Sequence, residues 1–429
     1  MMLQKIIKSF FSLSAITLLS RISGFAKVAG IASIFGRASY ADVLTAVMIL
    51  PDLVYKFLSE GLISGAAVPI FVKHKDDKDA LNKAFWSIFW ITAAVSLIIS
   101  IGLAIGTNSI CELIMPNIDQ LYESTLRRMW LILIPYLMLG MLSGVQTSLL
   151  NAKLSFAKPA IGPVLVNLSI IAVLPIATKD GIEIIAIANT IGALIQCIWL
   201  ALLIRWDDSL GVSAKKCFVW DKEIVTDFIK ASAPVVVWIS ILPLIPVYER
   251  HLLAADQGAI ATLNYTEKLF NLPLGIISIS LAYVILPNLS RLEGKERTEF
   301  LMKALGMASL AIAPIVAIMW FGADLIVEIV YMRGNFLADD AMVAASLFKV
   351  YGLALLPVSL NMILNRGFFA AGNFMIPFAA GLLATLLQLH VCNIAVSQYG
   401  IRGVAIAAIS AGFLQLIVLL LFSFRKKQK

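Results

Sequence analysis

Long apolar segments separated by short polar segments recur along the whole chain of 429 residues. A helix needs roughly 20 mainly apolar residues to cross a bilayer, and no large soluble block interrupts the apolar segments here. The pattern therefore predicts an all-α polytopic membrane protein with about twelve transmembrane helices. The predicted spans are 9–35, 41–72, 84–107, 127–150, 157–178, 182–205, 225–249, 259–289, 302–322, 342–371, 375–396 and 402–424. Prolines inside several spans, Pro135 and Pro357 among them, predict bent or interrupted helices.

The composition agrees with this pattern. The chain is 60% hydrophobic and 14% charged, and its mean hydropathy is +0.92. Soluble domains carry about 25% charged residues, so lipid is the expected solvent for most of this chain. The net charge of +8 would indicate a nucleic-acid partner in a soluble protein. In a membrane protein it is better explained by cationic loops, and no nucleic-acid partner is predicted.

The distribution of Lys and Arg predicts the orientation. If the N-terminus is cytoplasmic, twenty of the 34 Lys and Arg residues fall in cytoplasmic loops and ends, and seven fall in outside loops, Arg37 and Arg250 among these seven. Cytoplasmic loops carry the excess of positive charge in membrane proteins. Both termini are therefore predicted to be cytoplasmic. No small-residue cleavage site follows the first apolar run, which predicts an uncleaved first span.

The two halves of the chain resemble each other weakly. The second span ends in Ala-Val-Pro-Ile-Phe at 67–71, followed by Lys73. The eighth ends in Ile-Leu-Pro-Asn-Leu at 285–289, followed by Arg291. This favours a duplication, with an N-terminal lobe at 1–206, a cytoplasmic linker at 207–223 and a C-terminal lobe at 224–429. Two six-helix lobes around a central cavity form a recurrent transporter plan. The alternative is a coincidence of prolines in apolar sequence.

Seven Lys and Arg residues remain inside the predicted spans: Arg21, Lys27, Lys56, Lys230, Lys268, Lys349 and Arg366. A charge at the bilayer centre costs about 2.5–3.5 kcal/mol on insertion scales, and such residues usually face a protein interior or an aqueous cavity. Acidic residues accompany them at Asp42, Asp52, Glu60 and Glu267. Asp52, Lys56 and Glu60 follow a spacing of four residues, which places them on one helix face where they can pair.

These charges admit two interpretations. They can pair to hold helices together or extend to the membrane surface, which is favoured for Lys56, Lys230 and Lys349. Alternatively they line a cavity and bind substrate, which is favoured for Arg21, Lys27 and Lys268. Arg forms forked hydrogen bonds with phosphate oxygens and Lys supplies a point charge. A cavity lined by these groups suits an anionic head group such as a pyrophosphate.

Enzyme signatures are missing from the sequence. It contains no GxxxxGK[ST] phosphate loop, no GxSxG elbow and no His or Cys residues at metal-ligand spacing. The prediction is a transporter, not an enzyme, with no cofactor and with a coupling ion that the sequence does not identify. Polar residues such as Ser240, Gln388 and Asn393 either join a cation site or form hydrogen bonds between helices, and the second is favoured.

Several motifs resemble those of the MurJ (MviN) lipid II flippases of the MOP transporter superfamily. In the first two spans they are Ser-Arg-Ile-Ser-Gly-Phe-Ala-Lys at 20–27, Leu-Pro-Asp-Leu at 50–53 and Glu-Gly-Leu-Ile-Ser at 60–64. Later ones are Leu-Asn-Tyr-Thr-Glu-Lys-Leu at 263–269, Arg-Gly-Asn-Phe at 333–336 and Asn-Arg-Gly-Phe-Phe-Ala at 365–370. The resemblance covers nearly the whole chain, and its first-span and eighth-span motifs are the specific ones.

The resemblance implies a function in peptidoglycan biosynthesis, and through it in cell wall biogenesis and cell shape. A flippase of this family moves lipid II, the undecaprenyl-pyrophosphate-linked precursor, from the cytoplasmic to the periplasmic leaflet of the bacterial inner membrane by alternating access. Contacts with membrane lipids, and with cell-wall synthesis or division proteins, are compatible with this role. The predicted substrate-binding residues are Arg21, Lys27, Asp42, Lys56, Glu60, Lys268 and Arg366.

The sequence departs from the family pattern in three ways. The basic residue expected after the Leu-Pro motif falls on Tyr55, next to Lys56. The acidic residue that usually follows the Lys27 position is replaced by Val28. Twelve spans are predicted where the family usually has fourteen, and the last two normally help to form a groove for the lipid tail. The first twelve spans build the central cavity of the family.

Three other functions compete with this interpretation. An exporter of other lipid-linked oligosaccharides or of drugs would use the same fold, and a cation-coupled drug exporter would favour carboxylates over Arg and Lys in its cavity. A membrane-embedded glycosyltransferase or lipid phosphatase would need an acidic or His cluster at a loop, and the sequence shows none. An inert scaffold for division proteins would tolerate neutralisation of Arg21.

Overall fold

The computed structural model describes residues 2–55, 63–116, 118–177, 181–213, 216–241, 244–275, 292, 294–371, 373 and 375–425. The described residues form helices joined by short turns, without a β-strand among them, which confirms the predicted all-α class. The helices group into two compact units. The first comprises Met1–Ile34 with Ser39–Val247, and the second comprises Phe35–Ala38 with Tyr248–Lys429.

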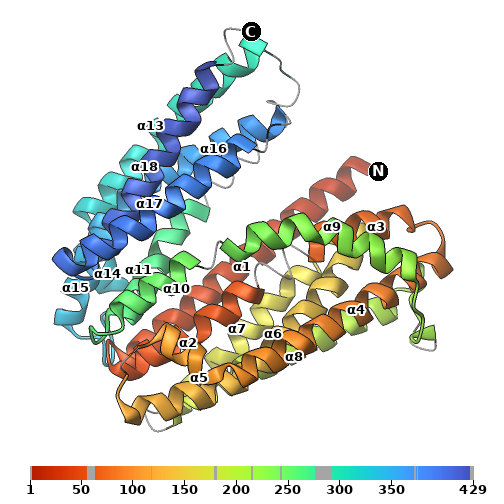
Figure 1. Ribbon diagram of the computed structural model, residues 1–429, viewed down its shortest axis with the longest axis horizontal. Helices are drawn as coiled ribbons and strands as arrows, with labels where there is room; N and C mark the ends of the chain where they lie inside the picture. Colours follow the sequence, from red (N-terminus) through yellow and green to blue (C-terminus); the bar gives the residue numbers. More distant parts are fainter. Residues whose placement is uncertain are drawn as a thin grey trace. The chain divides into compact units, whose positions relative to one another are not determined.

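The first unit contains the following helices (Figure 1): α1 (Met2–Phe35), α2 (Ser39–Tyr55), α3 (Ser64–Lys73), α4 (Lys78–Ile105), α5 (Thr107–Ile114), α6 (Gln120–Ala152), η2 (Pro159–Ile161), α7 (Gly162–Val173), η3 (Leu174–Ile176), α8 (Glu183–Trp206), η5 (Asp208–Leu210) and α9 (Lys222–Ile241). The second unit contains α11 (Ala259–Pro273), α13 (Gly294–Phe321), α14 (Ala323–Tyr331), α15 (Ala338–Gly352), α16 (Leu355–Ala370), α17 (Met375–Tyr399) and α18 (Arg402–Arg425). Helix α10 (Leu244–Leu253) contains the boundary between the units.

Nine stretches among the described residues are long and apolar enough to cross a membrane. They correspond to all predicted spans except the second, seventh and eighth. The described helices in those three are α2 and α3 in the second span, α9 and α10 in the seventh, and α11 in the eighth. The chain is therefore a multi-pass membrane protein, and the apolar pattern located these nine spans correctly.

The prolines affect these helices differently. Pro357 lies in the first turn of α16, directly after the break that separates α16 from α15. The first turn of a helix tolerates proline because its N–H groups have no partner within the helix. Pro135 instead lies inside α6, which continues through it without a break.

The core of the first unit forms where α3, α4, α6, α8 and α9 pack together, and Figure 1 shows α4, α6 and α8 running side by side. Buried apolar residues from these helices include Phe71, Phe85, Leu149, Leu200 and Phe228. Phe228 belongs to α9, which the sequence assigned to the C-terminal lobe. By its contacts this helix is part of the first unit, because its apolar face is buried against α3 and α4.

Each unit contains a helix of 28 residues followed by a short helix of eight or nine residues. They are α4 and α5 in the first unit and α13 and α14 in the second. A single glycine separates the two helices in both cases, Gly106 and Gly322. Its N–H donates to the carbonyl four residues earlier, on Gly102 and on Ile318. This correspondence supports the internal duplication proposed from the sequence.

The turn at Phe35–Ala38, between α1 and α2, packs within the second unit. The Tyr265 hydroxyl donates to the Gly36 carbonyl at 3.0 Å, and the Tyr331 hydroxyl donates to the Tyr265 carbonyl at 2.9 Å. Arg37 Nε donates to Thr262 Oγ1 at 2.7 Å. The turn is therefore held by hydrogen bonds to residues more than 200 positions away in the chain, which the sequence pattern does not predict.

Gly36 is required at this turn for two reasons. Its φ of +55° lies in the left-handed region, and a Cβ atom there would clash with the carbonyl oxygen of Asn335. The left-handed conformation costs an L-residue about 1–2 kcal/mol. We expect Gly36→Ala to lower the thermal unfolding midpoint of the purified protein by several degrees.

Gly306→Ala is the matched control for this prediction. Gly306 lies inside α13, and a Cβ atom there meets nothing within 4 Å. Alanine is favoured over glycine in a helix, so the control should leave the midpoint unchanged or raise it. Equal midpoints for the two variants would show that the turn does not need a glycine.

Candidate functional site

Arg21 and Lys27 both lie on α1, and both side chains are partly buried. Asn167 of α7 contacts the helix between them, since its amide nitrogen donates to Ser23 Oγ at 3.1 Å and to the Ser20 carbonyl at 3.4 Å. This contact fixes the rotation of α1 in the first unit. Among the described residues, Arg21 has no hydrogen-bond or ion-pair partner.

Asn167 acts here as a positioning residue that the sequence analysis missed. In the sequence, Asn167 is recognisable only as a polar residue within an apolar span. Such residues most often form hydrogen bonds between helices, as this one does.

Asp42 lies in the first turn of α2 and is 4% exposed. A carboxylate at this position is favoured because the partial positive charge of the helix dipole is located at the N-terminus. Lys56 and Glu60 lie outside the described residues. Their predicted pairing with Asp52 therefore lies outside the described structure as well. Their predicted roles, and that of Asp42 in substrate binding, stay predictions.

Lys268 lies on α11 in the second unit and is partly buried. Among the residues that the structure describes, none pairs with its ammonium group. The buried residues Thr262, Tyr265 and Leu269 anchor α11 in its unit. Arg366 lies near the end of α16 and is also partly buried, and the adjacent Gly367 packs closely against Leu301 of α13.

A buried ion cluster contains Glu249, Arg250, Glu267 and Gln388. Glu267 directly precedes Lys268 in the sequence. The Arg250 guanidinium contacts Glu249 at 3.2 Å and Glu267 at 2.5 Å. The Gln388 amide of α17 donates to Glu249 at 3.0 Å. The Arg250 side chain is 1% exposed. Its two carboxylate partners therefore compensate the cost of burying its charge.

This cluster corrects one assignment and confirms another. Arg250 was counted as a loop residue in the prediction of orientation, and this assignment is wrong because its guanidinium is buried between carboxylates of α10 and α11. Gln388 forms the hydrogen bond between helices that was favoured for it. Lys349 pairs with Asp324 of α14 at 2.7 Å, which confirms the structural interpretation of that charge.

The described part of the predicted linker at 207–223 lies within the first unit and is held along α4. The indole nitrogens of Trp86 and Trp90 donate to the carbonyls of Ser213 and Cys217, at 3.1 and 2.7 Å. The exposed Lys216 ammonium contacts Asp79 at 2.8 Å. This hydrogen bond, together with the charge of the Asp79 carboxylate, raises the pKa of Lys216 above its usual value. Within the described part of the chain, no group of His, Cys, Asp and Glu residues could hold a metal ion.

Comparison with known families decides the classification. The model of the lipid II flippase MurJ family matches residues 31–429. The chain belongs to the MurJ family. Among MurJ relatives, the probable lipid II flippase of Rhizobium tropici is 25% identical, over 98% of this chain and 81% of the relative. The lipid II flippase MurJ of Burkholderia cenocepacia is 24% identical, over 86% of this chain and 74% of the relative.

Solved structures place the MurJ fold in a wider group. A lipid II flippase MurJ in an inward closed conformation matches 96% of this chain and 87% of its own, with a TM-score of 0.85 and 23% identity. A multidrug resistance MATE family transporter of the MOP superfamily, in an inward-facing conformation, matches with a TM-score of 0.76 and 14% identity, over 94% of this chain and 95% of its own. The two-lobed helical fold predicted from the sequence is therefore confirmed.

Proposed function

We propose that this protein moves lipid II from the cytoplasmic to the periplasmic leaflet of the bacterial inner membrane. The observation that carries the proposal is the match of the MurJ family over residues 31–429, which contains all but two of the predicted binding residues. The other two, Arg21 and Lys27, lie in the first-span motif. The relatives that match along most of the chain are named as lipid II flippases.

The unpaired cations support an anionic substrate. Lipid II carries a pyrophosphate, and a buried cation without a protein partner gains a strong charge-assisted hydrogen bond from a phosphate oxygen. Among the described residues, the partly buried Arg21 in the first unit and Lys268 in the second have no such partner. Arg366 and Lys27 add positive charge to the same two units. We infer that these side chains bind the pyrophosphate at different stages of transport.

Alternating access is the mechanism that we propose for transport. Structures with the same fold are described in inward-facing and outward-facing conformations, with TM-scores of 0.76 and 0.68. The substrate leaves unchanged, so the protein would act without a catalytic residue. The excess of Lys and Arg in the loops on the side of the linker supports cytoplasmic termini.

Export of drugs or of other lipid-linked oligosaccharides is the second candidate. The MATE neighbours share the fold, but their identity to this chain is 14–16%, below the 24–27% of the MurJ relatives, which match along 86% or more of the chain. The similarity to drug exporters therefore concerns the fold alone, and lipid II stays the favoured substrate.

The test is complementation of a bacterial strain depleted of its own lipid II flippase. We expect the full chain to restore growth and cell shape. We also expect a lipid II-cleaving enzyme, added outside spheroplasts, to release its product at the normal rate, because only lipid II in the periplasmic leaflet is accessible to it. Failure of both readouts, while the protein accumulates in the membrane, would contradict the proposal.

A further inference from the structure

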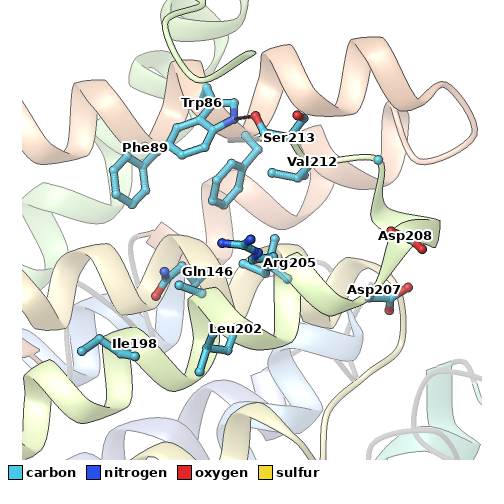
Figure 2. Close-up of a pocket in the computed structure, with 14 residues that line it drawn as sticks. Trp86, Phe89, Gln146, Ile198, Leu202, Arg205, Asp207, Asp208, Val212 and Ser213 are labelled. Carbon is cyan, nitrogen blue, oxygen red and sulfur yellow. Dashed lines mark hydrogen bonds between the residues drawn. The ribbon is translucent and has the colours of Figure 1, made fainter. Parts of the chain in front are cut away.

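The first unit contains an open pocket of about 740 Å³ at the end of α8, here called the α8 pocket. One wall contains Trp86 and Phe89 of α4, and the opposite wall contains Ile198, Leu202 and Arg205 of α8. Phe85 of α4 also lines the pocket. Gln146 of α6 lies between the two walls, and Gly211–Ser213 of the linker complete the pocket. Figure 2 shows the Arg205 side chain between Trp86 and Gln146.

The pocket is preformed by hydrogen bonds between α4 and the linker. Besides the bond from the Trp86 indole, the Ser213 N–H donates to Asn82 Oδ1 at 2.9 Å. The Lys78 ammonium donates to the carbonyl of Asp208 at 2.9 Å. These contacts hold the linker against α4. Ligand pockets are usually formed before the ligand binds, and this one does not require a rearrangement.

The mouth of the pocket presents both signs of charge. Arg205 is exposed, and Asp207 and Asp208 lie together at one end of the pocket (Figure 2). The Asp207 carboxylate accepts hydrogen bonds from the N–H and hydroxyl of Ser209. Neither the Arg205 guanidinium nor the Asp208 carboxylate has a partner among the residues that the structure describes. A simple anion would be repelled by the two carboxylates, and a simple cation by Arg205.

An apolar stripe leads away from this charged mouth along α8. Ile191, Ile195 and Ile198 follow helical spacing on one face, and their side chains are 49%, 42% and 50% exposed. In a spanning helix such residues face lipid chains. The pocket therefore continues into the surface that contacts the hydrocarbon of the membrane, with its charged groups at the helix end.

We propose that the α8 pocket binds phosphatidylethanolamine. Its phosphate would lie at Arg205, its ammonium at Asp207 and Asp208, and one acyl chain along Ile198, Ile195 and Ile191. The zwitterionic head group carries the two charges that the pocket mouth complements, and guanidinium forms forked hydrogen bonds with phosphate. The site is separate from the cations assigned to lipid II, and the proposal does not depend on the flippase activity.

Lipid binding to the purified, delipidated full-length protein tests this proposal. Native mass spectrometry would measure the affinities for phosphatidylethanolamine, phosphatidylcholine and phosphatidylglycerol with identical acyl chains. Choline cannot donate hydrogen bonds, and the glycerol head group has no cation. We expect phosphatidylethanolamine to bind at least several-fold more tightly than either of the other two lipids.

Two substitutions test the assignment of the charges. Arg205→Ala should weaken phosphatidylethanolamine binding about tenfold, as expected for the loss of a hydrogen bond to a charged group. Asp208→Asn should reduce the preference for phosphatidylethanolamine over phosphatidylglycerol. Arg128→Ala is the matched control, because Arg128 is exposed in the same unit and pairs with Glu183 at the opposite end of α8.

The outcomes separate this proposal from the proposed function. Equal affinities for the three lipids, or the same loss of binding in Arg205→Ala and Arg128→Ala, would overturn it. Unfolding midpoints equal to that of the wild type would show that the Arg205 and Asp208 variants are folded. Rescue of the flippase-depleted strain is a separate readout, which these lipid affinities do not determine.

Discussion

Alanine at Arg21 or at Lys268 is expected to abolish rescue of a flippase-depleted strain, while the protein still accumulates in the membrane. Each substitution removes a cation that has no partner among the described residues, so no ion pair of the described structure is lost. The substrate loses a hydrogen bond between charged groups, worth about 1.5–3 kcal/mol and a tenfold or larger change in binding. Growth after depletion and the amount of protein in membranes are the measurements.

The matched variants separate charge from packing. Arg21→Lys and Lys268→Arg keep the charge and should retain part of the rescue. Lys230→Ala removes an exposed cation of α9 and should rescue fully. Full rescue by both Arg21→Ala and Lys268→Ala would eliminate these residues as substrate ligands.

Loss of the Arg250 guanidinium is expected to produce the largest change in stability. Arg250→Ala leaves the carboxylates of Glu249 and Glu267 in the second unit without their shared cation. Removing one partner of a buried ion pair costs about 3–5 kcal/mol, because an uncompensated charge stays buried. We expect a clear decrease in the thermal unfolding midpoint of the purified protein in detergent.

The comparison variants show whether the unpaired charges cause this loss. Arg333→Ala removes an exposed arginine that follows the end of α14 and whose side-chain hydrogen bonds, in the described structure, go to carbonyls of that helix. It should change stability by less than about 0.5 kcal/mol. The triple variant Arg250→Met, Glu249→Gln, Glu267→Gln removes all three charges and should be more stable than Arg250→Ala. Equal midpoints for Arg250→Ala and Arg333→Ala would show that the cluster does not stabilise the unit.

Helix positions were the most predictable feature of this protein. The predicted span 182–205 corresponds to α8 at Glu183–Trp206, and the span 375–396 to α17 at Met375–Tyr399. The thickness of the bilayer sets the length of an apolar run, and the run is visible without tertiary information. The candidate cations were equally predictable, because any charge inside an apolar run is conspicuous. The sequence did not predict which of these cations lack a partner among the described residues.

The sequence by itself determined the membrane location, the helices and the family motifs that contain Arg21 and Lys268, since all of these depend on residues close together in the chain. Only the tertiary structure decided the partners. It placed Arg250 between Glu249 and Glu267, packed the turn at Phe35–Ala38 against Tyr265, and placed Arg205 opposite the aromatic residues of α4. Pairings of this kind depend on how helices distant in sequence pack together, and a local pattern of apolar and polar residues carries no information about them.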